Sequence, residues 1–322
     1  MTRDTAILAV AALLLDSLLG DPVFPLHPVR LMGKLNTAVE KFLKTVISGE
    51  KTAGWIGLAI GIFVPALCYA VLYRVAAPIP AAQVLISVVT IYFSIALKDL
   101  ARHGLAVKKA LGRKDLKDAG TLVSYLVTRD TGQMGMEEIT KCALESISEN
   151  GSDSVIAPLF WTLLFGAPGA LVYRAVNTLD AMWGYKTAQY VHFGKPAALL
   201  DDWINFIPAR ITGILYCLCA PFAGGSSSGA WRIMKRDHRN VFSPNAGYPE
   251  AAMAGALGVS IGGPGTYFGK RIQKKPMGDP VKPVHPDLIS RSLRILYVST
   301  LLFLVLSETA VLLLKGMVTP VQ

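Results

Sequence analysis

The chain has 322 residues, of which 52% are hydrophobic and only 17% carry a charge. A soluble domain has about 25% charged residues, so this composition argues against a purely soluble protein. The formal net charge is +10, but no basic stripe interleaved with aromatic residues is present, which argues against nucleic-acid binding. We attribute the basic excess mainly to loops on the cytoplasmic side of a membrane.

Long apolar runs account for the scarcity of charge. A run of about 20 such residues is long enough to cross a bilayer. The candidate spans are residues 53–73, 79–97, 154–173, 211–230 and 295–314. The runs 154–173 and 211–230 are interrupted by proline, glycine or serine, which favours broken or re-entrant helices there. We therefore predict an all-α integral membrane protein, a polytopic helical bundle of about four to six spans.

The segment after the first apolar stretch, residues 20–30, is dense in prolines and polar residues. It contains Asp21 and His27. His27 could contact a phosphate or act as an acid or base, since histidine titrates near neutral pH. A histidine beside prolines is more often structural, and both interpretations stay open here. Residues 34–51 continue as a basic, amphipathic connector.

Acidic and amide side chains crowd both ends of the run 154–173. Glu145, Glu149, Asn150 and Asp153 precede it, and Arg174, Asn177 and Asp180 follow it. Charges beside membrane-grade apolar sequence usually serve a site. The acids before the run recur at four-residue spacing and would share a helical face, where a bound cation would relieve their repulsion. The alternative is a charged helix end at the membrane surface, and spacing alone does not choose between the two.

A second polar set precedes the run 211–230. Asp202 and Asn205 mirror the Asn177 and Asp180 pair in reverse, and Arg210 follows them. Two such sets near two apolar runs indicate convergence on one cavity. The alternative is an acidic first turn that interacts favourably with a helix dipole.

The glycine-rich segment 262–271 resembles a phosphate-binding loop only in part. A Walker A motif requires glycine where Pro264 stands and serine or threonine where Arg271 stands. A glycine-rich backbone with Lys270 and Arg271 could still hold a phosphate. The alternative is a tight turn with a solvated basic end.

The distribution of basic residues predicts the topology. Loops 20–52, 98–153 and 224–294 are expected on the cytoplasmic side of one membrane-embedded domain, residues 1–322. If every run were a full span, residues 174–203 would lie outside, away from Glu149. Re-entrant or broken helices at 154–173 and 204–223 keep every polar set on the cytoplasmic side, and we prefer that arrangement.

Several ordered motifs resemble those of the cobalamin-biosynthesis membrane family adenosylcobinamide-phosphate synthase, nearly from end to end of the chain. The motifs are Asp16 with Gly20-Asp21-Pro22 and His27-Pro28-Val29; Arg129-Asp130-Thr131; Glu145, Glu149-Asn150, Asp153 and Ala157-Pro158-Leu159-Phe160; Tyr173-Arg174-Ala175-Val176-Asn177-Thr178-Leu179-Asp180; Asp201-Asp202, Asn205 and Pro208-Ala209-Arg210; and Asn245-Ala246-Gly247, Glu250, Gly263-Pro264, Tyr267 and Gly269. One departure is Leu199, where the family pattern has arginine, and it weakens a substrate assignment at that position.

The resemblance implies an ATP-dependent amide ligase in the cell membrane, with an active site that faces the cytoplasm. Its substrates would be adenosylcobyric acid, ATP and 1-aminopropan-2-ol or the phosphate of that amino alcohol. Chemistry, and not the resemblance, suggests the mechanism: a carboxylate is a poor acyl donor, so ATP would convert it to an acyl phosphate, which the amine then attacks. The implied cofactors are ATP and Mg²⁺, and the lipid bilayer and other membrane enzymes of late corrinoid assembly are further candidate partners.

The same resemblance guides the assignment of site residues. The candidate Mg²⁺ ligands, also expected to be catalytic, are Glu149, Asp153, Asp180 and Asp202, because Mg²⁺ bridges phosphate oxygens and a few carboxylates. A general base could be a carboxylate or His27. The candidate substrate and phosphate contacts are Asp21, Arg129, Asn150, Arg174, Asn177, Asn205, Arg210, Asn245, Glu250 and Lys270. A non-enzymatic membrane sensor on a related scaffold is the alternative function, although it needs no paired acidic sets, and a transporter is a third.

Overall fold

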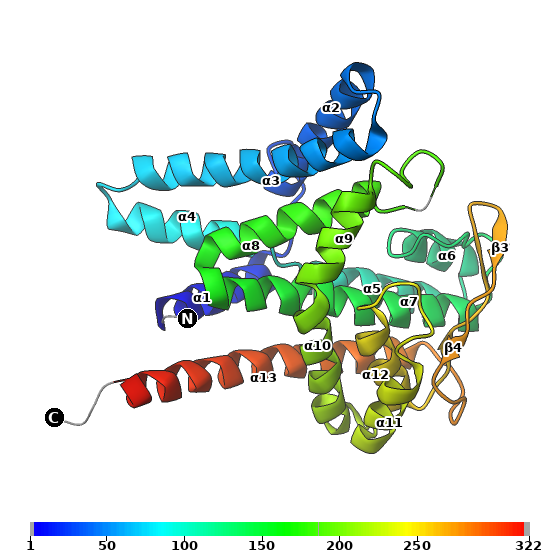
Figure 1. Cartoon of the computed structure of the whole chain (residues 1–322). Coiled ribbons are helices and arrows are strands. Elements are labelled where there is room, and N and C mark those ends of the chain that lie inside the picture. The colour runs from blue at the N-terminus through cyan, green and yellow to red at the C-terminus, as the bar shows by residue number, and fades with distance from the viewer. Residues whose placement is uncertain (1–2, 186, 319–322) are drawn as a thin grey trace. The chain divides into compact units, whose positions relative to one another are not determined.

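The computed structural model describes residues 3–185 and 187–318, and most of them are helical (Figure 1). This confirms the predicted all-α class. One membrane domain was expected from the sequence, and the residue contacts group the chain into two compact units. Unit 1 contains the chain up to residue 96, residues 157–205 and the chain from 307; unit 2 contains residues 97–156 and 206–306.

Unit 1 is built from helices, several of which are long and apolar. They are α1 (Arg3–Leu19), α2 (Pro28–Val46), α3 (Glu50–Val75), α4 (Pro80–Tyr92), α8 (Ala157–Trp183) and α9 (Lys195–Ile204). Small residues let them approach closely, as in many membrane proteins. A Cβ atom at Gly54 of α3 would collide with the carbonyl oxygen of Phe193, and one at Gly61 would lie 2.8 Å from Leu179. Leu179, Trp183 and Phe193 are fully buried in the resulting core.

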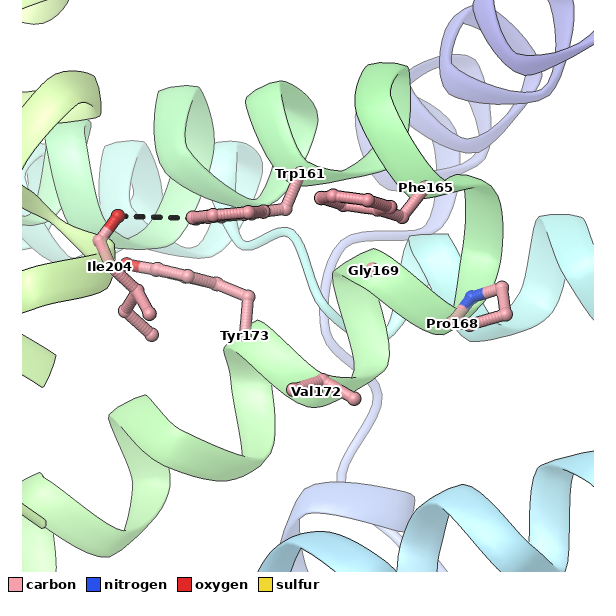
Figure 2. A pocket seen from close by; sticks show the side chains of 7 residues that line it. All are labelled: Trp161, Phe165, Pro168, Gly169, Val172, Tyr173 and Ile204. Carbon is pink, nitrogen blue, oxygen red and sulfur yellow. Dashed lines mark hydrogen bonds between the residues drawn. The ribbon is translucent and has the colours of Figure 1, made fainter. Parts of the chain in front are cut away.

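Helix α8 is broken at Gly166, as the glycine and proline pattern predicts. Gly166 has φ 68° and ψ −155°, a conformation that is essentially restricted to glycine. Figure 2 shows that the chain turns between Phe165 and Pro168, so that the arm with Trp161 and Phe165 lies beside the arm with Gly169 and Tyr173. The rings of Trp161 and Phe165 stack with their centroids 5.7 Å apart. The apolar run is therefore a helical hairpin and not one straight helix.

The two arms of α8 and the end of α9 enclose an apolar cavity of about 260 Å³. The indole nitrogen of Trp161 donates a hydrogen bond of 3.2 Å to the carbonyl oxygen of Ile204, drawn as a dashed line in Figure 2. This bond ties the first arm of α8 to α9. The break therefore places the end of α9 beside Tyr173 of the second arm, which lines the same cavity.

Unit 2 consists of helices packed around one central helix that is made mostly of small residues. Its elements are α5 (Leu97–Gly112), α6 (Leu116–Ser124), α7 (Met136–Gly151), the π-helical turn η1 (Ser152–Ile156), α10 (Phe206–Cys219), the 3₁₀ turn η2 (Ala220–Ala223), α11 (Ser227–Asp237), α12 (Gly247–Leu257) and most of α13 (Asp287–Val318). Helix α12 is buried along its length and packs against α7, α10 and α11. Its alanines and glycines make this possible, because they add little bulk at the helix contacts.

The glycine-rich segment forms two small antiparallel sheets. Strand β1 (Ile261–Gly262) pairs with β4 (Pro276–Met277), and β2 (Gly265–Tyr267) pairs with β3 (Lys270–Ile272). Phe268 and Gly269 have φ of 50° and 73° between β2 and β3. Two residues with positive φ form the type I′ turn that matches the twist of a hairpin. The segment is thus a hairpin, and its binding of a phosphate stays a prediction.

Five helical stretches in the described residues are long and apolar enough to cross a membrane. They are Glu50–Val75, Pro80–Gly112, Met136–Trp183, Phe206–Ala223 and Asp287–Thr309. This fits the predicted multi-pass protein. The run 79–97 was expected to form one helix. Instead, α4 ends at Tyr92, and residues 93–96 separate it from α5.

Candidate active site

Glu145 is the centre of a charged cluster in unit 2. One carboxylate oxygen accepts a hydrogen bond of 2.6 Å from the guanidinium of Arg129, and the other accepts one of 2.9 Å from the backbone N–H of Gly262. The Arg129 side chain is 9% exposed and that of Glu145 is 15% exposed. Burial lowers the pKa of Arg129 and the Glu145 carboxylate raises it, with a net shift upward. Arg129 is therefore a charged, fixed cation.

Tyr267 and Lys274 complete the positive side of this cluster. The guanidinium of Arg129 lies 5.6 Å from the centre of the Tyr267 ring, and the ammonium of Lys274 donates a 2.9 Å hydrogen bond to the Tyr267 hydroxyl. Cations near the faces of aromatic rings are stabilised electrostatically. The β-hairpin thus holds a second cation close to the first.

Glu250 is the most enclosed acid of the cluster. It lies on α12 and is only 5% exposed. Burial raises its pKa well above the usual range, the charges of Glu149 and Glu145 raise it further, and Lys274 and Arg129 oppose them. Glu145, Glu149, Glu250, Arg129 and Lys274 therefore interact as one group, which we call the Glu145 cluster. A raised pKa of this cause makes the carboxylate a stronger proton acceptor.

Other predicted residues of unit 2 take different positions. Asp153 lies in the π-helical turn η1, a rare geometry that is frequent at functional sites. The Asn150 amide donates to the backbone of Ser146 on its own helix, 3.0 Å away.

In the glycine-rich hairpin, Lys270 is exposed at the start of β3. The N–H of Gly269 donates to a carboxylate oxygen of Asp130 at 2.8 Å, as that of Gly262 does to Glu145, so these two N–H groups do not point at an open phosphate site.

Arg210 of unit 2 is fixed by aromatic rings. Its guanidinium lies 3.4 Å from the ring centre of Phe206 and 4.3 Å from that of Tyr248. It also donates to the side-chain oxygen of Asn245 at 3.4 Å. The structure therefore brings together Arg210 and Asn245, two of the residues predicted to contact substrate.

Unit 1 holds a second polar set at α9 and the second arm of α8. The hydroxyl of buried Tyr173 donates to the side-chain oxygen of Asn205 at 2.9 Å, and the Asn205 amide donates to Asp201 at 3.0 Å. The pKa of Asp201 is raised to about 7, chiefly by burial and next by the negative charge of Asp180. Hydrogen bonds from Asn205 and Asn177 lower it, and Asp202 adds a smaller upward effect. Three carboxylates thus act on one another here, and we call them, with Asn205 and Tyr173, the Asp201 set.

Arg174 and Asn177 lie on the same arm of α8. The guanidinium of Arg174 is 3.5 Å from the side-chain oxygen of Asn177. Arg174 also lines a cavity of about 260 Å³ in unit 1, whose other lining residues are mostly apolar. An arginine at the wall of such a cavity is suited to an anionic group on an otherwise apolar ligand.

His27 and Asp21 contact each other directly. The imidazole Nε2 lies 2.6 Å from a carboxylate oxygen of Asp21, and the ring packs against Phe24 and Phe93. His27 is only 4% exposed. This contact joins two positions of the proline-rich loop after α1. A structural role for His27, one of the two interpretations given above, predicts such a contact.

Residues 9–296 match the family described as CobD/Cbib protein. The chain is 45% identical over 310 residues to cobalamin biosynthesis protein CobD of Geobacter metallireducens, covering 95% of this chain and 96% of that one. It is 39% identical to the protein of the same name from Chromobacterium violaceum, over 97% of this chain and 98% of that one, and 38% identical to that of Clostridium tetani, over 92% and 95%. The chain belongs to the CobD/Cbib family. No solved structure matches it.

In this CobD/Cbib family member, the described residues contain no group of three or more His, Cys, Asp and Glu side chains arranged to hold a metal ion. The predicted ligands are divided, with Glu149 and Asp153 in unit 2 and Asp180 and Asp202 in unit 1. Mg²⁺ commonly binds one or two carboxylates together with water and phosphate oxygens, so a pair of acids is a fitting donor set. The metal assignment and the convergence of both polar sets on one cavity stay predictions.

Sequence reasoning missed several residues that the structure places in these clusters. They are Glu145 as a site residue, Asp201, Tyr173, Tyr267 and Lys274. Two signals were available. Glu145 precedes Glu149 by one helical turn, and Asp201 precedes Asn205 by four residues, which is a better helical pair than Asp202 with Asn205. Lys274 carries no local signal, because its partner Tyr267 is reached only through the hairpin.

Proposed function

We propose that the chain is an ATP-dependent amide ligase of cobalamin biosynthesis. It joins the free propionate of adenosylcobyric acid to 1-aminopropan-2-ol or the phosphate of that amino alcohol. The observation that carries this proposal is the match, over nearly the whole chain, to relatives named cobalamin biosynthesis protein CobD. The two polar clusters supply the kinds of side chain that such a reaction needs.

The cations of the site would bind the anionic groups of the substrates. Carboxylates and phosphates are recognised by arginine and lysine through charge-assisted hydrogen bonds. Arg129 and Lys274 are held in place by Glu145 and Tyr267, and Arg210 is held by two aromatic rings. Fixed cations lose little entropy on binding a ligand, so we assign them to phosphate or propionate contacts.

The attacking amine must lose a proton, because it enters as an ammonium ion at neutral pH. The raised pKa of Glu250 makes its carboxylate a stronger proton acceptor than an ordinary glutamate. Its neighbours Glu145 and Glu149 favour proton uptake, since a proton reduces the repulsion among the three acids. We assign the proton acceptor to Glu250 in preference to His27, which is held by Asp21.

The acids of the Asp201 set fit a divalent cation bound with a nucleotide. Asp180 and Asp202 both raise the pKa of Asp201, so a cation near them would relieve their repulsion. A bound Mg²⁺ would neutralise phosphate oxygens of ATP. Asp180 and Asp202 would orient it, and Asn205 and Tyr173 would fix the neighbouring Asp201.

The test is a product assay on the purified full chain with ATP, Mg²⁺, adenosylcobyric acid and either form of the amino alcohol, read by mass spectrometry. Asp153→Asn and Asp180→Asn keep side-chain size but remove the anion, so each should lower product formation by more than about 100-fold, since even the partners of metal ligands matter 10–100-fold. The matched control is Asp118→Asn, which removes a surface carboxylate paired with Arg113.

The control variant should stay within about twofold of the wild-type rate, as surface substitutions usually do. All variants are checked for an unchanged elution profile and unfolding midpoint. Absence of product from the wild-type chain with both amino alcohol forms would reject the ligase assignment. Near-normal turnover of both Asp variants at limiting Mg²⁺ would remove these acids from the metal site.

A further inference from the structure

Helix α2 has a buried face that fixes it to unit 1. Met32, Asn36 and Leu43 are buried on this face, and α2 packs against α3 and α8. Outside this face, the exposed residues of α2 include two parallel stripes of different chemistry. The reaction proposed above uses neither stripe.

The first stripe is basic. Arg30, Lys34 and Lys41 follow one another at intervals of four and seven residues, which places them on one side of a helix. All three are exposed, and with Gly33, Thr37, Ala38 and Met182 they line an open hollow of about 660 Å³. None of the three has an ion-pair partner in the part of the chain that the structure describes, whereas Lys44 on the same helix pairs with Glu40 at 2.7 Å. The hollow is thus lined by three uncompensated positive charges.

The second stripe is apolar and lies directly beside the first. Leu31 and Phe42 each follow a basic residue by one position, which is a rotation of about 100° around the helix. Leu31 is 42% exposed, Phe42 is 64% exposed and Val46 is 57% exposed. Large apolar side chains that remain this exposed along one helix indicate contact with a lipid or a protein.

We propose that α2 lies in the interfacial layer of the bilayer and that its basic hollow binds the phosphate of an anionic phospholipid. Helices with adjacent basic and apolar faces bind at this depth, with the apolar side chains among the acyl chains and the cations at the headgroups. A free phosphate would satisfy the basic stripe alone and leave Leu31, Phe42 and Val46 in water. A lipid satisfies both stripes at once, because it carries a phosphate and acyl chains in one molecule.

The experiment uses phosphatidylglycerol as the probe and phosphatidylcholine as its neutral comparison. The purified full chain in detergent is titrated with each lipid, and the bound lipid is counted by native mass spectrometry. Each cation near an anionic surface contributes enough to change affinity severalfold, so the wild-type chain should bind phosphatidylglycerol at least about tenfold more tightly. Raising the salt concentration should reduce this preference, because exposed charges are screened.

The test variant combines Arg30→Gln, Lys34→Gln and Lys41→Gln, and it should lose the preference for phosphatidylglycerol. The matched control combines Lys109→Gln, Lys117→Gln and Lys275→Gln, three exposed lysines outside α2, and it should keep the preference. Retention of the preference by the test variant, or an equal loss in the control, would overturn the proposal. Displacement of the lipid by inorganic phosphate, but not by sodium chloride at equal ionic strength, would also overturn it, because that result would indicate a site that needs no acyl chain.

A second measurement keeps the test valid if the triple variant fails to fold. Photoreactive phosphatidylglycerol is cross-linked to the wild-type chain, and the labelled peptides are sequenced. Labelling of the peptide that contains residues 30–42 supports the proposal, and labelling confined to other peptides overturns it. These readouts measure lipid binding and not catalysis, so they are independent of the proposed ligase reaction.

Discussion

Asp201 combines a hydrogen bond with two like-charged neighbours. Asn205 donates to one of its oxygens, and Asp180 and Asp202 raise its pKa. A carboxyl group with a pKa of about 7 is partly protonated at neutral pH. The folded protein therefore binds a proton here that the unfolded chain, with a pKa near 3.8, releases.

This proton makes stability depend on pH. Because the folded pKa is raised, the stabilisation is fully present below pH 3.8 and is lost as pH rises toward about 7. Asp201→Asn keeps the acceptor for Asn205 and removes the titration. We expect the variant to unfold at a higher temperature than the wild type at pH 8 and at a similar temperature at pH 4, as measured by thermal unfolding in detergent. An equal difference at both pH values would contradict the raised pKa.

Glu145 shows how a single residue can organise cations and backbone together. Its two oxygens accept from Arg129 and from Gly262, residues that lie 16 and 117 positions away in the chain. Replacing one partner of such a buried pair leaves the other charge without compensation, which is usually more harmful than replacing both. The cluster is therefore a unit in which Arg129 is positioned by Glu145.

At the scale of a single element, the shape of helix α8 depends on its break at Gly166. Gly166 has a backbone conformation that a residue with a Cβ atom adopts only under strain, although no neighbouring atom lies closer than 3.8 Å to the position of such an atom. The strain therefore comes from the backbone itself and not from a clash. The break positions Trp161 to donate to Ile204 of α9, and so fixes the surroundings of the Asp201 set.

Gly166→Ala tests the break. We expect it to destabilise the protein by about 1–3 kcal/mol, the usual cost of a residue held in such a conformation. The matched control is Gly112→Ala at the end of α5, where a Cβ atom meets nothing within 4 Å and φ is not positive. Thermal unfolding should show a lower midpoint for the first variant and little change for the second. Equal midpoints for both variants would show that the turn tolerates a Cβ atom.

The described chain as a whole has five stretches that could cross a membrane, connected by basic loops. The excess of lysine and arginine in loops 20–52, 98–153 and 224–294 predicts that they face the cytoplasm. The turn between α3 and α4 is expected on the opposite side. Soluble ATP and corrinoid would then reach, from the cytoplasm, α7 and η1, which carry Glu145, Glu149 and Asp153.

Cysteine labelling measures this orientation. The four native cysteines are replaced, and single cysteines are placed at the exposed positions Thr45, Lys117, Gln273 and Ala77. A membrane-impermeant maleimide should label the first three in inside-out vesicles and not in intact cells, and should label the Ala77 position in intact cells only. The reverse pattern, or labelling of Thr45 and Ala77 from the same side, would overturn the predicted topology.

The sequence by itself determined the class of protein, the approximate positions of the apolar stretches and the presence of a break in the run 154–173, although α10 in the run 204–223 is continuous. These follow from local properties: hydropathy over about 20 residues decides whether a helix can enter a membrane, and glycine and proline act on their own backbone. Tertiary structure decided which acids form clusters. Asp201 and not Asp202 bonds to Asn205, and Glu145 meets Gly262 across 117 positions of the chain. Such pairs depend on how helices and the hairpin pack, and pairing between distant segments has no periodic signal in the sequence.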